Sequence, residues 1–463
     1  MQSSYLTTGN IIVFFCVILL TLVSVFYGNM RARSSNEKET LIDYLIMGRR
    51  LTLPLFIFSL VSTWYGGIFG VTQISFESGV YNFVTQGFFW YITYIFFALF
   101  LVDKIKKYNA VTLPNLVEKM FGPMSAKLAA IFNLFNVIPI AYTISIGLLI
   151  DMLTGYGFLP SMIIGLTFVM AYSIFGGFRA VVFSDVIQFF VMFISVFLVA
   201  VFSFKEYGGI SYLKSALPET HFSLTGTHSL ATTLVWGFIS LSTLVDPNFY
   251  QRCFAAKDSM TAKKGILIST LIWFVFDICT TLGGMYARAA LPDASSQYAY
   301  MNYSLELLPN YLQGFFIAGI TATIISTLDS YLFLSGTTIT FDLLPKRFRE
   351  KIWLHRLSIV LVGIMSIALA LAFDGNIKKV WKILGSYSAS CLLLPVLVGH
   401  LFPKLISDLQ FTISCLTGVV ATTAWILIER TGIYADIDEL YIGMFSTLCA
   451  LIILRITSIR SAR

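Results

Sequence analysis

The chain has 463 residues, of which 57% are hydrophobic and only 12% are charged. One water-soluble core cannot bury so much apolar surface, so the composition excludes a soluble protein and predicts an all-α polytopic membrane protein. The net charge of +7 could indicate nucleic acid binding. It is better explained by an unequal distribution of basic residues between loops, and we expect no nucleic acid partner.

Apolar runs long enough to cross a bilayer recur along the chain, and about thirteen spans embedded in membrane lipid are predicted. Their approximate ranges are 9–29, 51–79, 82–103, 121–154, 158–176, 181–204, 226–248, 263–290, 312–341, 353–373, 376–402, 408–428 and 438–456. We expect the first span to be retained rather than cleaved as a signal peptide, because no positive charge precedes it. The pattern therefore predicts a multi-pass protein of the cell membrane.

Basic residues are distributed unequally between the two sets of loops. If the N terminus lies outside, the outer segments hold only seven of the 31 basic residues: Lys205, Lys214, Arg288, Lys378, Lys379, Lys382 and Arg430. All the others, Arg252 among them, then fall in inward-facing segments. Because cytoplasmic loops are enriched in Lys and Arg, this asymmetry predicts an N-out, C-in orientation.

Two of the spans carry glycines and hydroxyl residues in their middle. Gly66, Gly67 and Gly70 follow Ser62 and Thr63 in the second span, and the seventh has Gly237 before a run of serine and threonine. Interrupted spans at matching positions are typical of inverted repeats, so spans 2–6 and 7–11 are predicted to form a 5+5 core with two broken helices.

This core divides the chain into four segments. Residues 1–50 are predicted to form an N-terminal peripheral helix and a cytoplasmic loop, and residues 403–463 two C-terminal peripheral helices. Residues 51–204 and 205–402 are the two predicted five-helix repeats. We expect the chain to function as a monomer.

The ninth span contains many side chains with hydroxyl or carboxylate oxygens between residues 321 and 336, TATIISTLDSYLFLSG. At helical spacing Thr323, Ser326, Thr327 and Ser330 share one face, and Asp329 adds a carboxylate to the same turn. Such hydroxyls can simply bond back to their own helix or join neighbouring helices. Hydroxyl pairs beside a carboxylate, with no basic residue in the span, favour instead a site for a small hard cation.

Several stretches resemble motifs of the sodium/solute symporter family, in the family's order. They are 43–51 (DYLIMGRRL), 172–188 (YSIFGGFRAVVFSDVIQ), 246–265 (DPNFYQRCFAAKDSMTAKKG), 322–332 (ATIISTLDSYL) and the glycine- and proline-containing stretch 384–404. The resemblance implies a LeuT-type inverted-repeat fold. It also implies a transporter rather than an enzyme: a sodium-coupled secondary active symporter that imports a small organic solute by alternating access, with the sodium ion as the coupling ion.

The resemblance also implies a ligand set for sodium. In the family, a hydroxyl pair that matches Ser326 and Thr327 binds the ion together with a carbonyl that matches that of Thr323. The family pattern adds backbone carbonyls of Ser62 and Tyr65, from the break in the second span. Five oxygens suit sodium better than a transition metal.

A second cation or proton site is expected at Asp185, Asp329 and Ser330. Some relatives bind a further cation there, but with a hydroxyl where this chain has Asp329. Two carboxylates in a site of low dielectric cannot both stay ionised without a counter-charge, so they are expected to share a cation or a proton.

Two simpler interpretations of these carboxylates stay open. Asp185 lies near a helix N terminus, where the helix dipole favours a negative charge. Asp329 could turn to the cytoplasmic side and pair with Arg179 or Lys346.

Trp64 lies at the break of the second span, where family members place a residue that contacts the solute. The string 63–67, TWYGG, resembles the choline-transporting branch of the family. Aromatic faces can bind quaternary ammonium groups, although membrane aromatics most often only pack. Trp64, Phe88 and Trp236 are therefore predicted to line a solute pocket.

Two other functions remain alternatives to symport. A membrane sensor or regulatory subunit could use the same scaffold, although no kinase-like extension is present in the sequence. A passive facilitator would not need the cation site.

Overall fold

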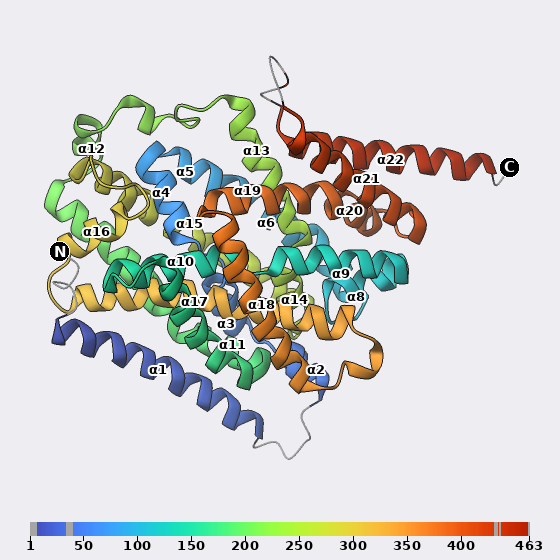
Figure 1. The fold of residues 1–463 in the computed structure, drawn as a ribbon, viewed down its shortest axis with the longest axis horizontal. Helices are drawn as coiled ribbons and strands as arrows, with labels where there is room; N and C mark the ends of the chain where they lie inside the picture. Colours follow the sequence, from blue (N-terminus) through green and yellow to red (C-terminus); the bar gives the residue numbers. More distant parts are fainter. Residues whose placement is uncertain (1–6, 34–39, 430–433, 435–436, 462–463) are drawn as a thin grey trace.

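The computed structural model describes residues 7–33, 40–429, 434 and 437–461. These residues form helices joined by short loops, and their only β-type pairing is an isolated bridge between Leu51 and Ala256. Arg430, one of the basic residues predicted on the outer side, lies outside the described residues, as do parts of the predicted terminal segments. Figure 1 shows the helices packed into one bundle.

Eleven helical segments of the described chain are long and apolar enough to cross a membrane. They are Thr8–Gly28, Tyr81–Lys107, Pro123–Thr154, Gly177–Tyr207, Leu230–Ala255, Ser259–Ala290, Leu312–Leu343, Ile352–Ala372, Ile377–Leu401, Asp408–Leu427 and Glu439–Thr457. Two shorter apolar helices, Leu53–Ser62 and Phe158–Ile174, fall where the two other spans are predicted. The total of thirteen and the orientation stay predictions.

The predicted break in the second span separates α3 (Leu53–Ser62) from α4 (Ile68–Ser78). Residues 63–67 between them are not helical, because Gly66 and Gly67 carry no side chain and Thr63 turns its hydroxyl back to the Ser59 carbonyl, 2.8 Å away. The break therefore leaves backbone groups of this segment without partners in their own helix.

The second predicted break lies between α13 (Leu230–Ser240) and α14 (Pro247–Ala255), with the 3-10 turn η5 (Leu241–Val245) between them. Gly237 itself lies inside α13. Asp246 is extended, and its carboxylate accepts hydrogen bonds from the backbone N–H groups of Asn248 (2.9 Å) and Phe249 (3.2 Å). With Pro247 at the first helical position, this N-cap starts a new helix.

The fifth and sixth predicted spans form one kinked helix, α11 (Phe158–Tyr207). Gly177 bends it with a backbone φ of 61°, a conformation that glycine adopts without a steric penalty. The ring of Tyr44 lies so close to Gly177 that a Cβ there would be 2.8 Å from Tyr44 Cδ2. Both the backbone angle and the closeness of the Tyr44 ring therefore favour glycine at this kink.

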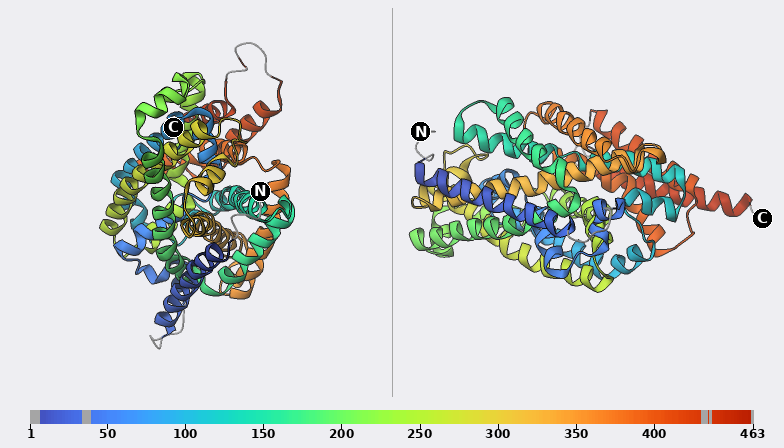
Figure 2. Two further views of the ribbon diagram at one scale, coloured as in Figure 1. Left: turned by 90° about the vertical axis from the view of Figure 1, so that its left-hand side faces the viewer. Right: turned by 90° about the horizontal axis from the view of Figure 1, so that it is seen from below.

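At the centre of the bundle lies α17 (Leu312–Thr337), continued by the π-turn η6 (Thr338–Leu343) (Figure 1). Its neighbours are α11, α10 (Ile140–Thr154), α18 (Ile352–Ala372) and the peripheral helix α1 (Thr8–Arg33). At the opposite end, α21 (Asp408–Leu427) and α22 (Glu439–Ser461) pack together, and α22 extends beyond the body of the bundle (Figure 2).

The remaining elements complete the spans or cover their ends. They are α2 (Leu41–Ile46), η1 (Met47–Arg49), α5 (Tyr81–Phe83), η2 (Val84–Phe88), α6 (Phe89–Phe96), η3 (Phe97–Leu101), α7 (Val102–Lys107), α8 (Leu113–Met120), α9 (Pro123–Val137), α12 (Ile210–Ala216), η4 (Glu219–Phe222), α15 (Ser259–Ala290), α16 (Ala299–Leu307), η7 (Lys346–Phe348), α19 (Ile377–Ser388), η8 (Ala389–Leu393) and α20 (Leu394–Leu401). The short helices α2, α8, α12 and α16 were not predicted from hydropathy, because none is long enough to span a bilayer.

Candidate functional site

The hydroxyl face of α17 meets the break between α3 and α4. The Ser326 hydroxyl lies 2.8 Å from the carbonyl oxygen of Ser62 and 3.1 Å from that of Thr323. The Thr327 hydroxyl lies 3.4 Å and 3.2 Å from the same two oxygens. Four of the five oxygens predicted for sodium thus form one cluster, and its contacts to Ser62 join two helices rather than closing within α17.

Tyr65 supplies the fifth predicted oxygen, and its carbonyl is oriented differently. The N–H of Gly66 donates to the Thr327 hydroxyl at 2.9 Å. The described peptide bonds are all trans, so the carbonyl of Tyr65, which shares that peptide, points away from Thr327. A ligand role for the Tyr65 carbonyl would require this peptide to rotate.

Gly66 allows α17 to approach the break closely. A Cβ at Gly66 would lie 2.5 Å from the Cβ of Thr327 and 2.7 Å from a ring carbon of Tyr142. Real Cβ atoms do not approach other carbons that closely, so any larger residue would separate Thr327 from the break.

The guanidinium of Arg252 is buried near this cluster. The sequence predicts this residue in an inward-facing segment, and the structure places it on α14 with no exposed surface. One terminal nitrogen donates to the hydroxyls of Ser59 and Ser330, both at 3.1 Å, and lies 3.9 Å from the Asp185 carboxylate. The other donates to Asn248.

Asp185 is also fully buried and belongs to the same network. Its carboxylate accepts a 2.7 Å hydrogen bond from Ser59, and its backbone carbonyl accepts from the Ser62 hydroxyl at 3.2 Å. The counter-charge that two buried carboxylates need is thus supplied in part by Arg252, which lies outside the ninth span. Arg252 contacts both Asp185 and Ser330, two of the three residues predicted for a second cation or proton site.

The third residue, Asp329, faces a different set of hydroxyls. It accepts from Tyr172 at 2.9 Å and from Ser184 at 3.5 Å. Its side chain has no exposed surface and bonds to two hydroxyls of α11, and its pairing with Arg179 or Lys346 stays a prediction. Its second oxygen, Oδ1, has no hydrogen-bond partner among the described residues.

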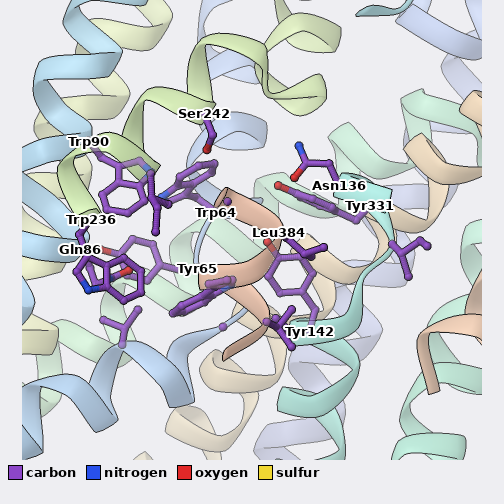
Figure 3. Close-up of a pocket in the computed structure, with 18 residues that line it drawn as sticks. Trp64, Tyr65, Gln86, Trp90, Asn136, Tyr142, Trp236, Ser242, Tyr331 and Leu384 are labelled. Atoms are coloured by element: carbon purple, nitrogen blue, oxygen red, sulfur yellow. The ribbon is translucent and has the colours of Figure 1, made fainter. Parts of the chain in front are cut away.

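A cavity of about 140 Å³ adjoins the break. Its walls come from both broken helices and from η2, α6, α9, α10, α17 and α19. They include four tryptophans and three tyrosines: Trp64, Trp90, Trp236, Trp381, Tyr65, Tyr142 and Tyr331. Gln86, Asn136 and Ser242 supply polar groups, and the described lining contains no Asp, Glu, Lys, Arg or His. Figure 3 shows Trp64, Trp90 and Trp236 on one side of the cavity and Tyr142 and Tyr331 on the other.

Trp64 and Trp236 line the cavity as predicted, whereas Phe88 does not. Its side chain is 49% exposed on the outside of the bundle and packs beside Phe89. Gln86 and Trp90, two residues to either side, face the cavity instead. Residues two apart on a helix point to nearly opposite faces, so Phe88 faces outward when Gln86 and Trp90 face the cavity.

Sequence reasoning missed most of the cavity wall and the buried position of Arg252. Trp381 packs on the break, where a Cβ at Gly67 would lie 2.0 Å from its ring. No local pattern marks Trp381, because only the packing of α19 onto α4 brings it there. Arg252 carried a signal, since it lies within the 246–265 motif, but a basic residue near a span end also fits a loop.

Comparisons with known proteins agree with this architecture. The sequence pattern of the Sodium:solute symporter family matches residues 44–408. The osmoregulated proline transporter OpuE of Bacillus subtilis (strain 168) is 24% identical over 383 residues, covering 75% of this chain and 76% of the relative. The high-affinity choline transporter 1 of Drosophila melanogaster is 23% identical over 429 residues, covering 86% and 66%.

The fold is also similar to that of a Na⁺-coupled sialic acid symporter solved in a substrate-bound, outward-open state. The TM-score is 0.78 at 17% sequence identity, over 97% of this chain and 98% of the other. Its LeuT-type fold, the apolar helices and the family match make this chain a multi-pass protein of the cell membrane and a transporter rather than an enzyme. The chain belongs to the sodium:solute symporter family.

Proposed function

We propose that the protein couples the inward movement of sodium to the import of a small organic solute by alternating access. One observation carries this proposal. The segment 62–67 contributes the Ser62 carbonyl to the oxygen cluster and Trp64, Tyr65 and Gly67 to the wall of the cavity. Ion and solute would therefore act on the same non-helical segment.

The coupling follows from the chemistry of a broken helix. Carbonyl groups freed at the break cannot be left bare inside a membrane, and a sodium ion can satisfy them. An ion held by Ser62, Ser326 and Thr327 would fix the conformation of the break, and with it the orientation of Trp64. Solute binding would then cost less once sodium is bound, which is positive coupling between the two sites.

The aromatic lining favours a solute with a substituted ammonium group. Tryptophan and tyrosine faces attract such cations, and several rings around one cavity form the arrangement that binds them best. The lining has no basic side chain to pair with a carboxylate, which favours an organic cation over an acid or a zwitterion. The similarity to a choline transporter agrees with this solute class.

The balance of charge among Asp185, Asp329 and Arg252 favours a further bound cation near Asp329. If Asp185, Asp329 and Arg252 are all ionised, the group carries one net negative charge, and the Oδ1 atoms of both carboxylates have no hydrogen-bond partner among the described residues. A buried charge without a partner is costly. A second monovalent cation at Asp329 would balance it, and a shared proton is the alternative.

Uptake into sealed proteoliposomes tests the proposed function. Solute uptake should require an inward sodium gradient, and sodium should raise the melting temperature of the purified protein because ligands stabilise by mass action. Uptake that is equal with and without sodium would indicate a passive facilitator. Sodium and solute binding without any transport would indicate a sensor.

Trp64→Ala tests the solute class. Choline is the probe for an organic cation, glycine betaine for a zwitterion and glucose for a neutral solute. The half-saturating choline concentration of the variant should be about tenfold higher than that of the wild type, which corresponds to roughly 1.4 kcal/mol. The reason is that one of the aromatic faces around the cavity is lost.

A tryptophan on the outer surface supplies the control for this variant. Trp353→Ala removes a side chain that is 59% exposed at the start of α18 and should leave the choline constant unchanged. If a folded Trp64→Ala protein has the same choline affinity as the wild type, Trp64 contributes to packing and not to solute binding. Stronger binding of glucose than of choline by the wild type would overturn the solute class.

A further inference from the structure

The guanidinium of Arg252 lies where four helices meet, directly beside the proposed sodium site. Its contacts are Ser59 on α3, Asp185 on α11 and Ser330 on α17, and Arg252 itself is on α14. Ser59 and Ser330 each lie three positions along their helices from a member of the oxygen cluster, Ser62 and Thr327. Arg252 lies six positions after Asp246, the N-cap of α14. In the predicted orientation, all four lie on the cytoplasmic side of Ser62, Ser326 and Thr327.

The contacts between Arg252 and the oxygen cluster are continuous. Arg252 donates to Ser59 at 3.1 Å, and Ser59 donates to the Asp185 carboxylate at 2.7 Å. The Ser62 hydroxyl donates to the Asp185 backbone carbonyl at 3.2 Å, and the Ser62 carbonyl is within 2.8 Å of the Ser326 hydroxyl. These contacts connect Arg252, through Ser59 and Asp185, to Ser62, whose carbonyl belongs to the proposed sodium site.

Stability alone gives a weak reason for this arrangement. Burying a guanidinium and a carboxylate removes both from water, and well-packed apolar residues of the same volume often stabilise a protein equally well or better. Arg252 has no exposed surface, and its Nε has no hydrogen-bond partner among the described residues. Ionisable groups inside a membrane generally mark ion pathways.

The oxygens that hold Arg252 are also those that a departing ion would need. A sodium ion that moves from Ser326 toward the cytoplasm has the Ser59 hydroxyl, the Asp185 carboxylate and the Ser330 hydroxyl as its next oxygen ligands. The guanidinium occupies all three. Two cations cannot share these oxygens at such short distances without strong repulsion.

We propose that Arg252 is a tethered cation that closes the inner end of the sodium site and must withdraw before sodium can leave. The inference rests on the proposed function, because it needs a sodium ion bound at Ser326 and Thr327. Arg252 is attached to α14, the segment that follows the break in the second predicted repeat. Movement of α14 would therefore withdraw the guanidinium and open the inner path in a single step.

Sodium retention in the absence of solute distinguishes this role from a purely structural one. Sealed proteoliposomes are loaded with radioactive sodium, and its release is followed without solute on either side. Arg252→Gln should release sodium about tenfold faster than the wild type, while Arg252→Lys, which keeps the charge, should retain most of it. Loss of a structural ion pair would lower the melting temperature and the uptake but would not speed sodium release.

Arg347→Gln is the matched control. Arg347 is exposed on η7, in a segment predicted to face inward, and its guanidinium lies over the ring of Phe348. The Arg347→Gln protein should release sodium at the wild-type rate. If Arg252→Gln does not fold, Ser59→Ala decides the question, because the Ser59 hydroxyl bridges Arg252 to Asp185 and its loss should also speed sodium release.

The outcomes separate the two proposals. A folded Arg252→Gln protein, or a Ser59→Ala protein, that retains sodium as well as the wild type overturns the role of Arg252 while leaving symport intact. A wild type without sodium-dependent uptake overturns the proposed function itself, and the role of Arg252 with it. Faster release in Arg347→Gln as well would also overturn the inference, since any loss of an inner arginine would then have the same effect.

Discussion

At the scale of single residues, the hydroxyls of Ser326 and Thr327 have unequal contacts. Both approach the carbonyls of Ser62 and Thr323, but only Thr327 also accepts the N–H of Gly66. Ser326→Ala removes one ion ligand, whereas Thr327→Ala removes a ligand and leaves a buried N–H without a partner. We therefore expect both variants to raise the half-saturating sodium concentration for uptake, by about tenfold for Ser326→Ala and more for Thr327→Ala.

Thr321→Ala is the control for these two variants. Thr321 lies on the same helix, and its hydroxyl donates to the carbonyl of Ile317 one turn earlier. Removing this hydroxyl should therefore leave sodium activation of uptake unchanged. If Ser326→Ala and Thr327→Ala both keep the wild-type sodium dependence, the placement of the sodium site is wrong.

Asp329→Asn tests the second cation. The asparagine can still accept the Tyr172 hydroxyl, so the substitution removes the charge and keeps the contact. We expect the wild type to move more than one sodium ion per solute and the variant to move one, as measured from the solute gradient that balances a known sodium gradient. A shared proton would appear instead as pH-dependent uptake that the variant loses. A one-to-one stoichiometry, insensitive to pH and unchanged in Asp329→Asn, would remove the second site.

At the scale of elements, the break between α3 and α4 lies between the proposed ion site and the cavity. Its two glycines contact different side chains. Gly66 packs against Thr327 and Gly67 against the ring of Trp381. Gly66→Ala should therefore weaken sodium activation first, because overpacking of about 1–3 kcal/mol would push Thr327 away from Ser62. Gly67→Ala should instead raise the solute constant, because it displaces a wall of the cavity.

Gly237→Ala supplies the control at the other broken helix. A Cβ there would lie 3.3 Å from the nearest ring carbon of Phe89, a distance that a small shift relieves. The half-saturating sodium and solute concentrations of the Gly237→Ala protein should stay within about twofold of the wild type. Substitutions that cause only a small local shift usually change stability by tenths of a kcal/mol. Identical effects of the Gly66 and Gly67 variants on both constants would show that the break responds as a single unit.

At the scale of the whole molecule, we propose the four-part organisation given above: residues 1–50, the repeats 51–204 and 205–402, and residues 403–463. The proposal includes thirteen spans, an N-out and C-in orientation, and a functional monomer in membrane lipid. It predicts that the loop around Lys214 lies outside and the loop around Lys404 inside, and both side chains are exposed.

Cysteine labelling checks this orientation. Cys16 is the exposed cysteine among those described, so Cys16→Ser lowers the background. Lys214→Cys should then react with a membrane-impermeant maleimide on intact cells, and Lys404→Cys only after permeabilisation. The reverse pattern would invert the orientation, and with it the assignment of Arg252 to the inner end of the sodium site.

Local sequence determined the long apolar helices, both breaks and the hydroxyl face of α17. These features depend on hydropathy, on glycine and on a spacing of 3.6 residues, all of which act within one span. Tertiary structure decided which residues meet. The contact between Ser326 and Ser62 joins positions 264 residues apart, the burial of Arg252 depends on three other helices, and Phe88 faces outward because of how η2 is rotated. Such partners are set by the packing of whole helices against one another, and that packing leaves no periodic trace in the sequence of any one of them.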